Sequence, residues 1–327
     1  MKKSMFKRIL TSVLALVMLF AFCACGSETN DSGNEAAAEL TIAYQGGIGY
    51  APIHIMETKK LIESNYDGKV EITFQKLDSG ADINTGIIGG TIDIGCMGVG
   101  PAVSAVASGV PAKIISNLCS QTHGLMTSDP SIKTLSDIKD TQIALVNIGS
   151  FQHILLAMAA EKELGDAHAL DNNIVKMAHA EGYAALDSGT YKLHLTSSPF
   201  INRERESDKF TEIKAVNEIW PDGNSFLVSI ASTKLESENP ELFEAVTKAF
   251  SQAISFINEN ENEAAEIIAT YLQQDVETTL KDLQDPTCMF FGELKGVSQM
   301  ADFMYRAKFI ENEVKFDELK FSNVTGD

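Results

Sequence analysis

Four loops carry the residues whose types and spacing suit them to hold a small ligand. Each loop is rich in glycine, serine or proline and follows a predicted β-strand: residues 45–50, 97–101, 147–152 and 197–200. Helices that begin after such strands direct free N–H groups and a partial positive charge at the carboxyl edge of the sheet. Glycine also lets the backbone approach a ligand closely. The loops therefore predict a site for an anion or a dipole that needs no basic side chain.

The sequence lacks the motifs by which common enzymes are recognised. It contains no GxSxG, GxxxxGK[ST] or HExxH motif, and no GxGxxG motif after the first predicted strand. Of the six histidines, His123 and His153 are the two placed to contact a ligand, with a hydrogen-bonded structural role as the alternative for each. We therefore predict no catalytic residue, no metal site and no cofactor.

Predicted strands and helices alternate through most of the chain, which is typical of an α/β fold with mostly parallel sheets. A first series has strands at 40–44, 70–74, 91–95, 112–118 and 124–127, with helices at 51–62, 83–88 and 101–108. A second series has strands at 142–146, 174–177 and 193–196, with helices at 151–164 and 182–186. A strand at 226–230 and helices at 241–258, 261–272, 275–283 and 296–307 follow. The two series predict two sheets rather than one.

Residues 1–24 have the pattern of an export signal. Four basic residues precede an apolar run from Ile9 to Phe22, and the small residue Ala24 precedes Cys25. This order resembles a bacterial lipoprotein signal, in which Cys25 is lipidated and becomes the mature N-terminus, although Phe22 stands where that motif prefers an aliphatic residue. Residues 25–38 have the composition of a flexible linker. We predict an extracytoplasmic protein anchored to the cell membrane by its lipid, with secretion and release as the alternative.

Charge and cysteine content exclude several classes of protein. The formal net charge of −19 disfavours binding to nucleic acid or to anionic lipid headgroups, so attachment to a membrane has to come from the lipid. A cut before Cys25 leaves Cys96, Cys119 and Cys288, which have no paired CxxC spacing. This pattern predicts buried apolar residues rather than a disulfide framework or a zinc site.

Four phrases of the sequence are similar to one family of transport proteins. They are GIGYAPIHIMETKKLIE, INTGIIGGTIDIGCMGVGPAVSAVASGVPAKIISNL, LSDIKDTQIALVNIGSFQHILL and ENPELFEAVTKAF. The chain resembles the extracellular solute-binding proteins of ABC importers, in the nitrate, sulfonate and taurine group that also includes binders of bicarbonate and thiamine pyrimidines. The resemblance implies an α/β fold with two lobes, the type II periplasmic-binding-protein-like fold, in which two hinge crossings flank a ligand cleft. Lobe 1 is expected at 39–130 with 225–327, and lobe 2 at 131–224.

The resemblance also implies how the protein works and which residues contact its ligand. The lobes of a monomer would close on a small molecule, and the closed form would dock on a membrane permease and its ATPase. Trp220, the only tryptophan, would lie at the second crossing. The residues expected to contact the ligand are Gly49, Tyr50, Met97, Gly98, Val99, Gly100, His123, Gly149, Ser150, Phe151, Gln152, Ser197, Ser198, Pro199, Phe200 and Trp220.

The ligand and the role both have alternatives. The phrase LHLTSSPF stands where relatives often have an acidic residue and an alanine before Trp-Glu-Pro-Phe. The interpretation is a small organic anion such as an alkanesulfonate, taurine or nitrate, and the alternative is a neutral or aromatic heterocycle such as a thiamine pyrimidine precursor. An importer component without catalysis is favoured over a two-lobed enzyme that uses His123 or His153 as acid and base, and over a sensor lipoprotein, because the loops show no nucleophile or carboxylate–histidine pair.

Overall fold

The computed structural model describes residues 37–327. The predicted export signal, the predicted lipidation site Cys25 and most of the predicted linker lie outside the described residues. Within the described part, none of the helices combines the length and the apolar character that crossing a membrane requires.

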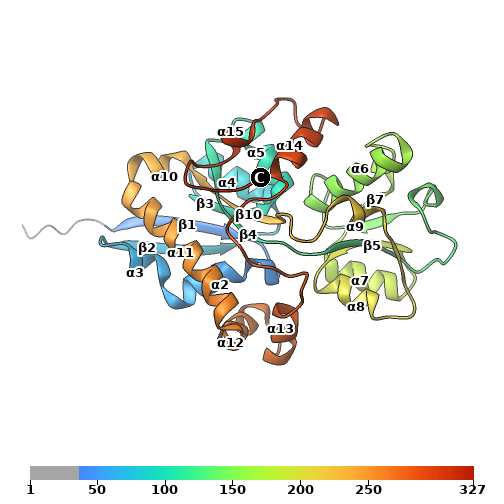
Figure 1. Cartoon of the computed structure of the whole chain (residues 1–327), viewed down its shortest axis with the longest axis horizontal. Helices are drawn as coiled ribbons and strands as arrows, with labels where there is room; N and C mark the ends of the chain where they lie inside the picture. The colour runs from blue at the N-terminus through green and yellow to red at the C-terminus, as the bar shows by residue number, and fades with distance from the viewer. Residues whose placement is uncertain (1–36) are drawn as a thin grey trace, which may run out of the picture. The chain divides into compact units, whose positions relative to one another are not determined.

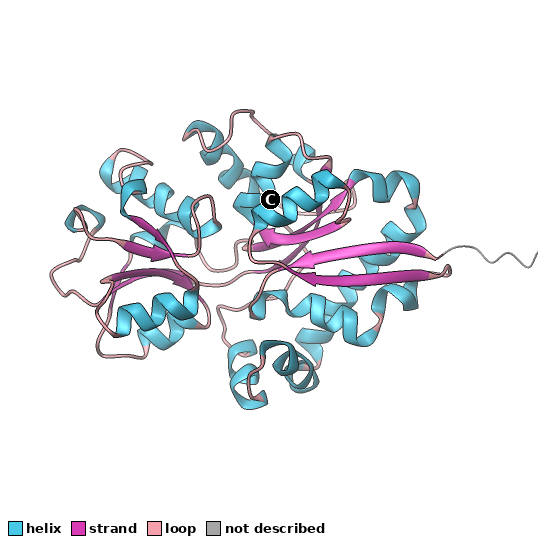
Figure 2. Ribbon diagram, turned by 180° about the vertical axis from the view of Figure 1, so that it is seen from behind, coloured by secondary structure: helices cyan, strands magenta, loops and turns pink. Residues whose placement is uncertain are grey.

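The first sheet has five strands in the order β2-β1-β3-β10-β4. Its strands are β1 (Ala38–Tyr44), β2 (Val70–Lys76), β3 (Ile94–Gly98), β4 (Ala112–Cys119) and β10 (Leu227–Ser232). β1 runs parallel to β2 and β3, whereas β10 is antiparallel to both of its neighbours. Figure 2 shows this sheet as one of two separate groups of strands. A strand from late in the sequence therefore completes the middle of a sheet built from the first 120 residues.

Two groups of helices cover the first sheet, and together they form the first lobe (Figure 1). One group consists of α2 (Ala51–Lys59), α3 (Leu61–Asn65), α10 (Thr233–Glu238), α11 (Pro240–Glu259), α12 (Glu261–Leu272) and α13 (Val276–Leu283). The other consists of α4 (Gly80–Gly89), α5 (Val99–Ala107), α14 (Val297–Arg306) and α15 (Phe316–Leu319). The long α11 illustrates why these segments are helical: Asn239 caps it, Pro240 opens it, and Leu242, Val246 and Phe250 recur on its buried face.

The second sheet also has five strands, in the order β7-β6-β8-β5-β9. Its strands are β5 (His123–Thr127), β6 (Ile143–Leu145), β7 (Ile174–Lys176), β8 (Leu193–Ser197) and β9 (Thr211–Ile213). Its helices are α6 (Phe151–Leu164), α7 (His179–Asp187), α8 (Phe200–Arg205) and α9 (Ala215–Ile219). α6 packs with α9, whereas α7 packs with α8 and β8, so this sheet too has helices on both faces and forms the second lobe.

The strand that follows each crossing is the antiparallel strand of its sheet. β5 follows the short crossing at residues 120–122, and β10 follows the crossing at residues 220–226. The two-lobed α/β fold is thus as predicted. β5 lies in the second sheet, although the family resemblance predicts that residues up to 130 belong to lobe 1. The proposed lobe boundary therefore moves to the segment between Cys119 and His123.

Most predicted elements are present, and α6 has its predicted bounds. The prediction for β3 is wrong by three residues: the strand runs from Ile94 to Gly98, and α5 starts at Val99 without an intervening loop. The reason is long-range, because β10 supplies hydrogen-bonding partners as far as Gly98. Pro101 is the third residue of α5, where a missing N–H costs no helical hydrogen bond. The predicted helix at 51–62 divides at Lys60, which has φ 51°, and the short β9 was not predicted.

Two glycines test how tightly β3 packs against α4. A methyl group at Gly95 would lie 2.3 Å from Cγ2 of Ile83, a buried branched side chain, whereas one at Gly89 would meet nothing within 4 Å. We expect Gly95→Ala to lower the free energy of unfolding by about 1–3 kcal/mol. Gly89→Ala, at the end of α4, should leave it unchanged or raise it by up to about 1 kcal/mol. Urea unfolding of both variants measures this, and equal effects would contradict the packing described.

Candidate functional site

The two lobes touch where α6 begins and where β3 passes into α5. A Cβ atom at Gly98 would lie 3.1 Å from Cβ of Phe151, and one at Gly100 would lie 3.2 Å from Cγ1 of Ile154. Both glycines belong to the first lobe, whereas Phe151 and Ile154 belong to the first turn of α6 in the second. The absence of side chains at these glycines therefore lets the start of α6 lie directly on the β3–α5 junction.

Four aromatic rings meet beside this contact, and we call them the His123 cluster: His123, Phe151, Trp220 and Phe226. The His123 ring lies 4.9 Å from that of Phe151 and 4.4 Å from that of Phe226. The Trp220 ring stands edge-on to Phe151 at 5.6 Å. His123 and Trp220 are only 3% and 4% exposed, yet no group makes a hydrogen bond of normal geometry with either ring nitrogen of His123 or with the indole Nε1. The backbone of Gln121 is near enough to His123 to oppose slightly the lowering of its pKa. Buried polar atoms are nearly always paired, so these three nitrogens are the unusual feature of the region.

Burial keeps the imidazole of His123 uncharged. Loss of solvation, helped by the nearby His179, lowers the pKa of His123 to about 3. A neutral imidazole has one N–H donor and one acceptor nitrogen, and the indole of Trp220 adds a second donor. The His123 cluster therefore offers a ligand apolar ring faces together with two donors and one acceptor, and no formal charge.

A second set of polar side chains extends from α6 into the second sheet. Nε2 of Gln152 lies 3.4 Å from Nε2 of His179, whose Nδ1 lies 3.0 Å from the hydroxyl oxygen of Thr196. When the amide of Gln152 donates to His179, the histidine carries its proton on Nδ1 and donates it to Thr196. Burial lowers the pKa of His179 to about 3, so this imidazole is neutral as well. This series of hydrogen bonds fixes the orientation of the Gln152 side chain.

The loop before α6 is held by the helix that it precedes. The hydroxyl oxygen of Ser150 accepts the backbone N–H of His153 at 3.2 Å and caps α6. The backbone N–H of Gly149, at φ 77°, donates to Nδ1 of His153 at 2.9 Å. Nε2 of His153 lies 3.0 Å from Asp171. Both nitrogens of His153 are thus occupied in positioning the loop, and the hydroxyl proton of Ser150 stays available to a ligand.

The other predicted residues lie around the crossings. A Cβ atom at Gly49 would lie 2.9 Å from Sγ of Cys119, just before the first crossing, and the neighbouring Tyr50 is buried. Ser197 is paired with His123 across β5 and β8, which places the Ser198–Pro199 turn close to the His123 cluster. The Phe200 ring lies 6.1 Å from that of His179.

Met97 and Val99 differ from the other predicted residues because both are fully buried in the first lobe. The backbone N–H of Val99 donates to the carbonyl of Phe226 at 3.0 Å and is therefore not free to bind a ligand in this structure.

Sequence reasoning missed His179, Thr196 and Phe226. His179 opens α7 directly after β7, so the rule that selected the other strand-end loops applies to it as well. It was missed because the predicted helix began three residues later, at Gly182. Phe226 has no such signal, since its position depends on β10 joining the first sheet.

A buried carboxylic acid lies behind His179. Nδ1 of His194 is 2.6 Å from Oε1 of Glu204, and both side chains are fully buried. Loss of solvation raises the pKa of Glu204 to about 8 and lowers that of His194 to about 4, so both members of the pair are uncharged near neutral pH. The pair is therefore an internal hydrogen bond of the second lobe rather than an ion pair.

Neither the cysteines nor the carboxylates of the described residues suggest a metal site. Residues 37–327 contain no group of three or more His, Cys, Asp or Glu side chains placed to bind a metal ion. Cys96, Cys119 and Cys288 are buried and not disulfide-bonded, as predicted. Burial raises the pKa of Cys96 and Cys288 to about 12, which keeps them as unreactive thiols.

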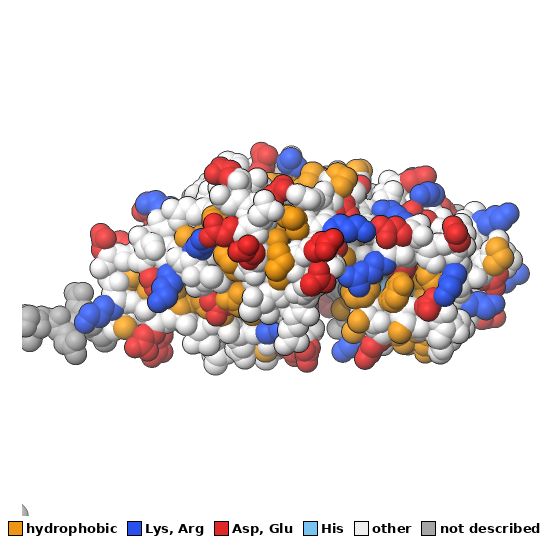
Figure 3. Space-filling view, turned by 90° about the horizontal axis from the view of Figure 1, so that it is seen from below, with side chains coloured by type: hydrophobic (Ala, Val, Ile, Leu, Met, Phe, Trp, Pro, Cys, Tyr) orange, Lys and Arg blue, Asp and Glu red, His pale blue; other side chains and the backbone are white. Residues whose placement is uncertain are grey.

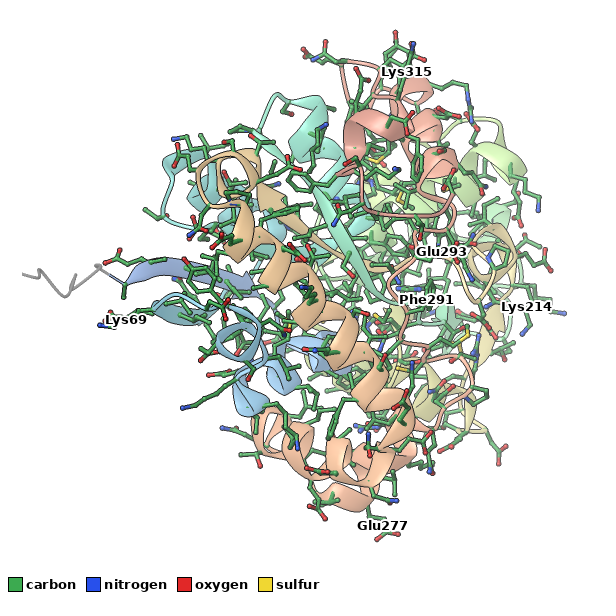
Figure 4. The ribbon with its side chains drawn as sticks, turned by 60° about the vertical axis from the view of Figure 1, so that its left-hand side comes forward. Lys69, Lys214, Glu277, Phe291, Glu293 and Lys315 are labelled. Carbon is green, nitrogen blue, oxygen red and sulfur yellow. The ribbon has the colours of Figure 1, made fainter. Side chains whose placement is uncertain are left out.

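A hollow of about 480 Å³ lies beside the second crossing and is lined by residues that include Gly223 and Phe291, the latter labelled in Figure 4. Two of its polar side chains bond to the protein itself: the amide of Asn258 donates to the carbonyl of Phe290, and that of Gln284 to Glu261. None of its lining side chains is among the buried unpaired polar groups of residues 37–327, in contrast to the His123 cluster.

A family model described as NMT1-like matches residues 33–272, which is most of the chain. The chain belongs to the NMT1-like family. This NMT1-like protein is 20% identical over 312 residues to a Bacillus subtilis (strain 168) protein named for binding aliphatic sulfonates, with 92% of this chain and 91% of that protein covered. The predicted resemblance to solute-binding proteins of ABC importers is confirmed.

Solved structures share the fold of this NMT1-like protein. The alkanesulfonate-binding protein of Xanthomonas axonopodis pv. citri, bound to MOPS, superposes with a TM-score of 0.68 at 18% identity, covering 89% of this chain and 100% of that one. The periplasmic nitrate-binding protein of Synechocystis PCC 6803 gives a TM-score of 0.63 at 12% identity, covering 86% and 84%. At these identities the likeness shows a shared two-lobed fold.

The Glu204–His194 pair predicts how stability depends on pH. Folded Glu204 keeps its proton up to about pH 8, whereas the unfolded side chain loses it near 4.5, so stability falls as the pH rises between these values. His194 acts in the opposite sense between about pH 4 and 6.5, which leaves a net loss between about 6.5 and 8. We expect Glu204→Gln, which is isosteric with the neutral acid, to reduce this loss by about 1–2 kcal/mol.

Urea unfolding of wild type and Glu204→Gln at several pH values measures the difference, and every other titrating group is common to both proteins. The matched control is Glu206→Gln, because Glu206 is exposed and pairs only with Lys281 at the surface. It should keep the pH dependence of the wild type. Equal slopes for wild type and Glu204→Gln would contradict an uncharged pair.

Proposed function

We propose that this protein is the lipid-anchored, substrate-binding component of an ABC importer, and that it captures a small organic anion such as an alkanesulfonate between its two lobes. Closure around the ligand would give the form that delivers it to a membrane permease. In this proposal the protein performs no catalysis and acts as a monomer, and the lobes are residues 39–122 with 225–327 and residues 123–224.

The observation that carries the proposal is the His123 cluster with its three unpaired nitrogens. An unpaired buried donor or acceptor costs about 1–3 kcal/mol, so a site that retains three of them is set up to recover this energy from a ligand. The cluster lies where rings from both lobes meet, with Phe226 from the first lobe and Phe151 from the second. A ligand bound there would contact both lobes and stabilise their closure.

An organic anion fits the groups around the cluster. The first turn of α6 supplies free N–H groups and a partial positive charge, and the hydroxyl of Ser150 can donate beside them. The aromatic rings can cover an alkyl tail. The proteins named for binding aliphatic sulfonates, alkanesulfonates and nitrate are consistent with this class of ligand. On the face in Figure 3, acidic and basic side chains are interspersed, so this face offers no basic patch that would attract an anion.

A neutral aromatic heterocycle is the second candidate, and the neutrality of the imidazoles favours it. The pKa values of His123 and His179 are both lowered to about 3, so neither side chain would carry a positive charge to meet an anion. A heterocycle could stack on the rings of the cluster and match the imidazole donor and acceptor. A catalytic role for His153 has less support, because both of its nitrogens are already occupied by Gly149 and Asp171.

A thermal-shift screen separates the two ligand classes. Alkanesulfonates, taurine, nitrate, bicarbonate, pyrimidines and aromatic acids are tested, because a ligand that binds only the folded state at 100 times its Kd adds about 2.7 kcal/mol of stability. Stabilisation by sulfonates supports the anion. Stabilisation by a pyrimidine alone supports the heterocycle, and no stabilisation by any compound contradicts both.

The variant His123→Phe tests the site. Phenylalanine keeps an aromatic ring in the cluster and removes two unpaired buried nitrogens, so the midpoint without ligand should stay level or rise. The affinity for the ligand found in the screen should fall at least tenfold, since the donor and acceptor of His123 are lost, and the thermal shift caused by that ligand should become smaller. The control Phe321→Leu removes a ring that packs on Phe243 in the first lobe, outside the cluster, and should keep the affinity within about threefold. Unchanged binding by His123→Phe would move the site elsewhere.

Lipid attachment at Cys25 has its own test. In cells that express the full chain, the wild type should fractionate with membranes and incorporate a labelled fatty acid. Cys25→Ser removes the thiol that would accept the lipid, so the protein should lose the label and leave the membrane fraction. The control Cys96→Ser changes a buried thiol of the first lobe and should keep the label. Labelled Cys25→Ser protein would contradict the proposed anchor.

A further inference from the structure

A second contact between the lobes involves His168, which lies in the segment between α6 and β7. Its Nδ1 is 2.8 Å from a carboxylate oxygen of Asp171, in its own lobe. Its Nε2 is 2.7 Å from the carbonyl oxygen of Ala307, which follows α14 in the first lobe. A carbonyl and a carboxylate can only accept hydrogen bonds, so both nitrogens of His168 must carry protons. The geometry therefore requires the positively charged imidazolium.

The position of this cation is favourable for a second reason. Ala307 caps the C-terminal end of α14, where the last carbonyl groups lack helical partners and carry a partial negative charge. Consistent with this, the hydrogen bonds to Ala307 and Asp171 raise the pKa of His168 above its ordinary value. The contact with Ala307 and Asp171 therefore stabilises the protonated form of His168, which is the form that can make both hydrogen bonds.

Asp171 connects this contact to the loop that precedes α6. Its other carboxylate oxygen accepts from Nε2 of His153, whose Nδ1 in turn accepts the backbone N–H of Gly149. The ring of Phe309, from the segment after α14, lies 5.2 Å from that of His153 and 4.9 Å from that of His168. One carboxylate thus joins the end of α14 to the loop that precedes α6.

The other charged groups around His168 do not replace this arrangement. From its own segment, Asp166 accepts the backbone N–H of His168. From α6, Glu161 is held by Arg306 at 2.6 Å, which is a neighbouring ion pair between the lobes. From the segment after α14, the ammonium of Lys308 lies over the ring of Tyr305. Each of these groups has a partner other than the Ala307 carbonyl, and His153, which shares Asp171, bonds within its own lobe. His168 is therefore the titratable side chain that joins the two lobes here.

We propose that His168 is a proton-operated latch between the two lobes, whose imidazolium form bonds Asp171 in the second lobe and the Ala307 carbonyl in the first. Closure then favours the protonated side chain, and the closed form weakens as the pH rises and His168 loses its proton. The latch rests on contacts within the chain, whereas its effect on ligand affinity rests also on the proposed function.

The latch is tested first without any ligand. Spin labels are attached at Lys69→Cys and Lys176→Cys, which are exposed positions at the outer strands of the two sheets. Pulsed electron paramagnetic resonance then measures the distance between the two lobes. The three native thiols are buried and should not react. The labelled protein should shift from closed to open distances as the pH is raised from about 6 to about 9, because the loss of one imidazole proton removes one of the two hydrogen bonds. A distance distribution that is independent of pH would overturn the proposal.

Two variants separate the latch from other titrations. His168→Gln can still donate to the Ala307 carbonyl but cannot titrate, so its distances should not change with pH. Arg306→Gln removes the neighbouring ion pair with Glu161 but leaves His168 and Asp171 in place, so it should shift the distances towards the open form by a similar amount at every pH and retain the pH dependence. The same pH dependence in His168→Gln and wild type would overturn the latch, even when both proteins are folded.

Nitrogen NMR of the labelled imidazoles supplies an independent readout. The ring of His168 should show both nitrogens protonated at the low end of the pH range and one at the high end, whereas the buried His123 should show one throughout. When the screen yields a ligand, for example an alkanesulfonate, its affinity should be about three- to tenfold higher at the lower pH in wild type and equal at both in His168→Gln. If the distance between the lobes depends on pH but none of the screened compounds binds, the latch is supported and only the proposed ligands are rejected.

Discussion

The contact of α6 with the β3–α5 junction is the interaction on which the rest of the structure depends. Phe151 and Ile154 lie against Gly98 and Gly100, and a single Cβ atom at either glycine would stand only 3.1–3.2 Å from them. This close approach places Phe151 next to His123 and Phe226. It also brings the N-terminus of a helix from one lobe to the surface of the other. The cluster of unpaired nitrogens exists because this contact shields it from water.

Neutrality is the common electrostatic property of the interior of this acidic protein. His123, His179, His194 and Glu204 are all kept uncharged by burial, although the chain carries a net charge of −19. Recognition at such a site depends on hydrogen-bond geometry and on ring packing rather than on opposite charge. Release of a ligand is then easier than from a buried ion pair, because opening the lobes leaves no bare charge behind. This property suits the proposed role, in which the protein passes its ligand on to a permease.

The contacts at the end of α14 differ in kind from the glycine contact. Arg306–Glu161 and His168–Ala307 are polar and partly exposed, so salt weakens the ion pair, and the proposed latch would make the histidine contact depend on pH. The glycine contact is apolar and close-packed, and it sets the geometry of closure. Asp171 joins the two regions through His153 and Gly149. In the proposed closure, the glycine contact would fix the geometry and the polar contacts would adjust the strength.

The sequence by itself determined the strand and helix series, the strand-end loops and the bounds of α6, because local periodicity and capping residues such as Ser150 specify these features. It also carried the family resemblance. Only the tertiary structure decided that β3 extends to Gly98, that β5 joins the second sheet, and that Phe226 and His179 lie near His123. These outcomes depend on β10 and on the two crossings, which bring together residues more than 50 positions apart in the chain. Local propensity holds no information about such pairings, since their energy comes from hydrogen bonds and burial that form only when both partners are in place.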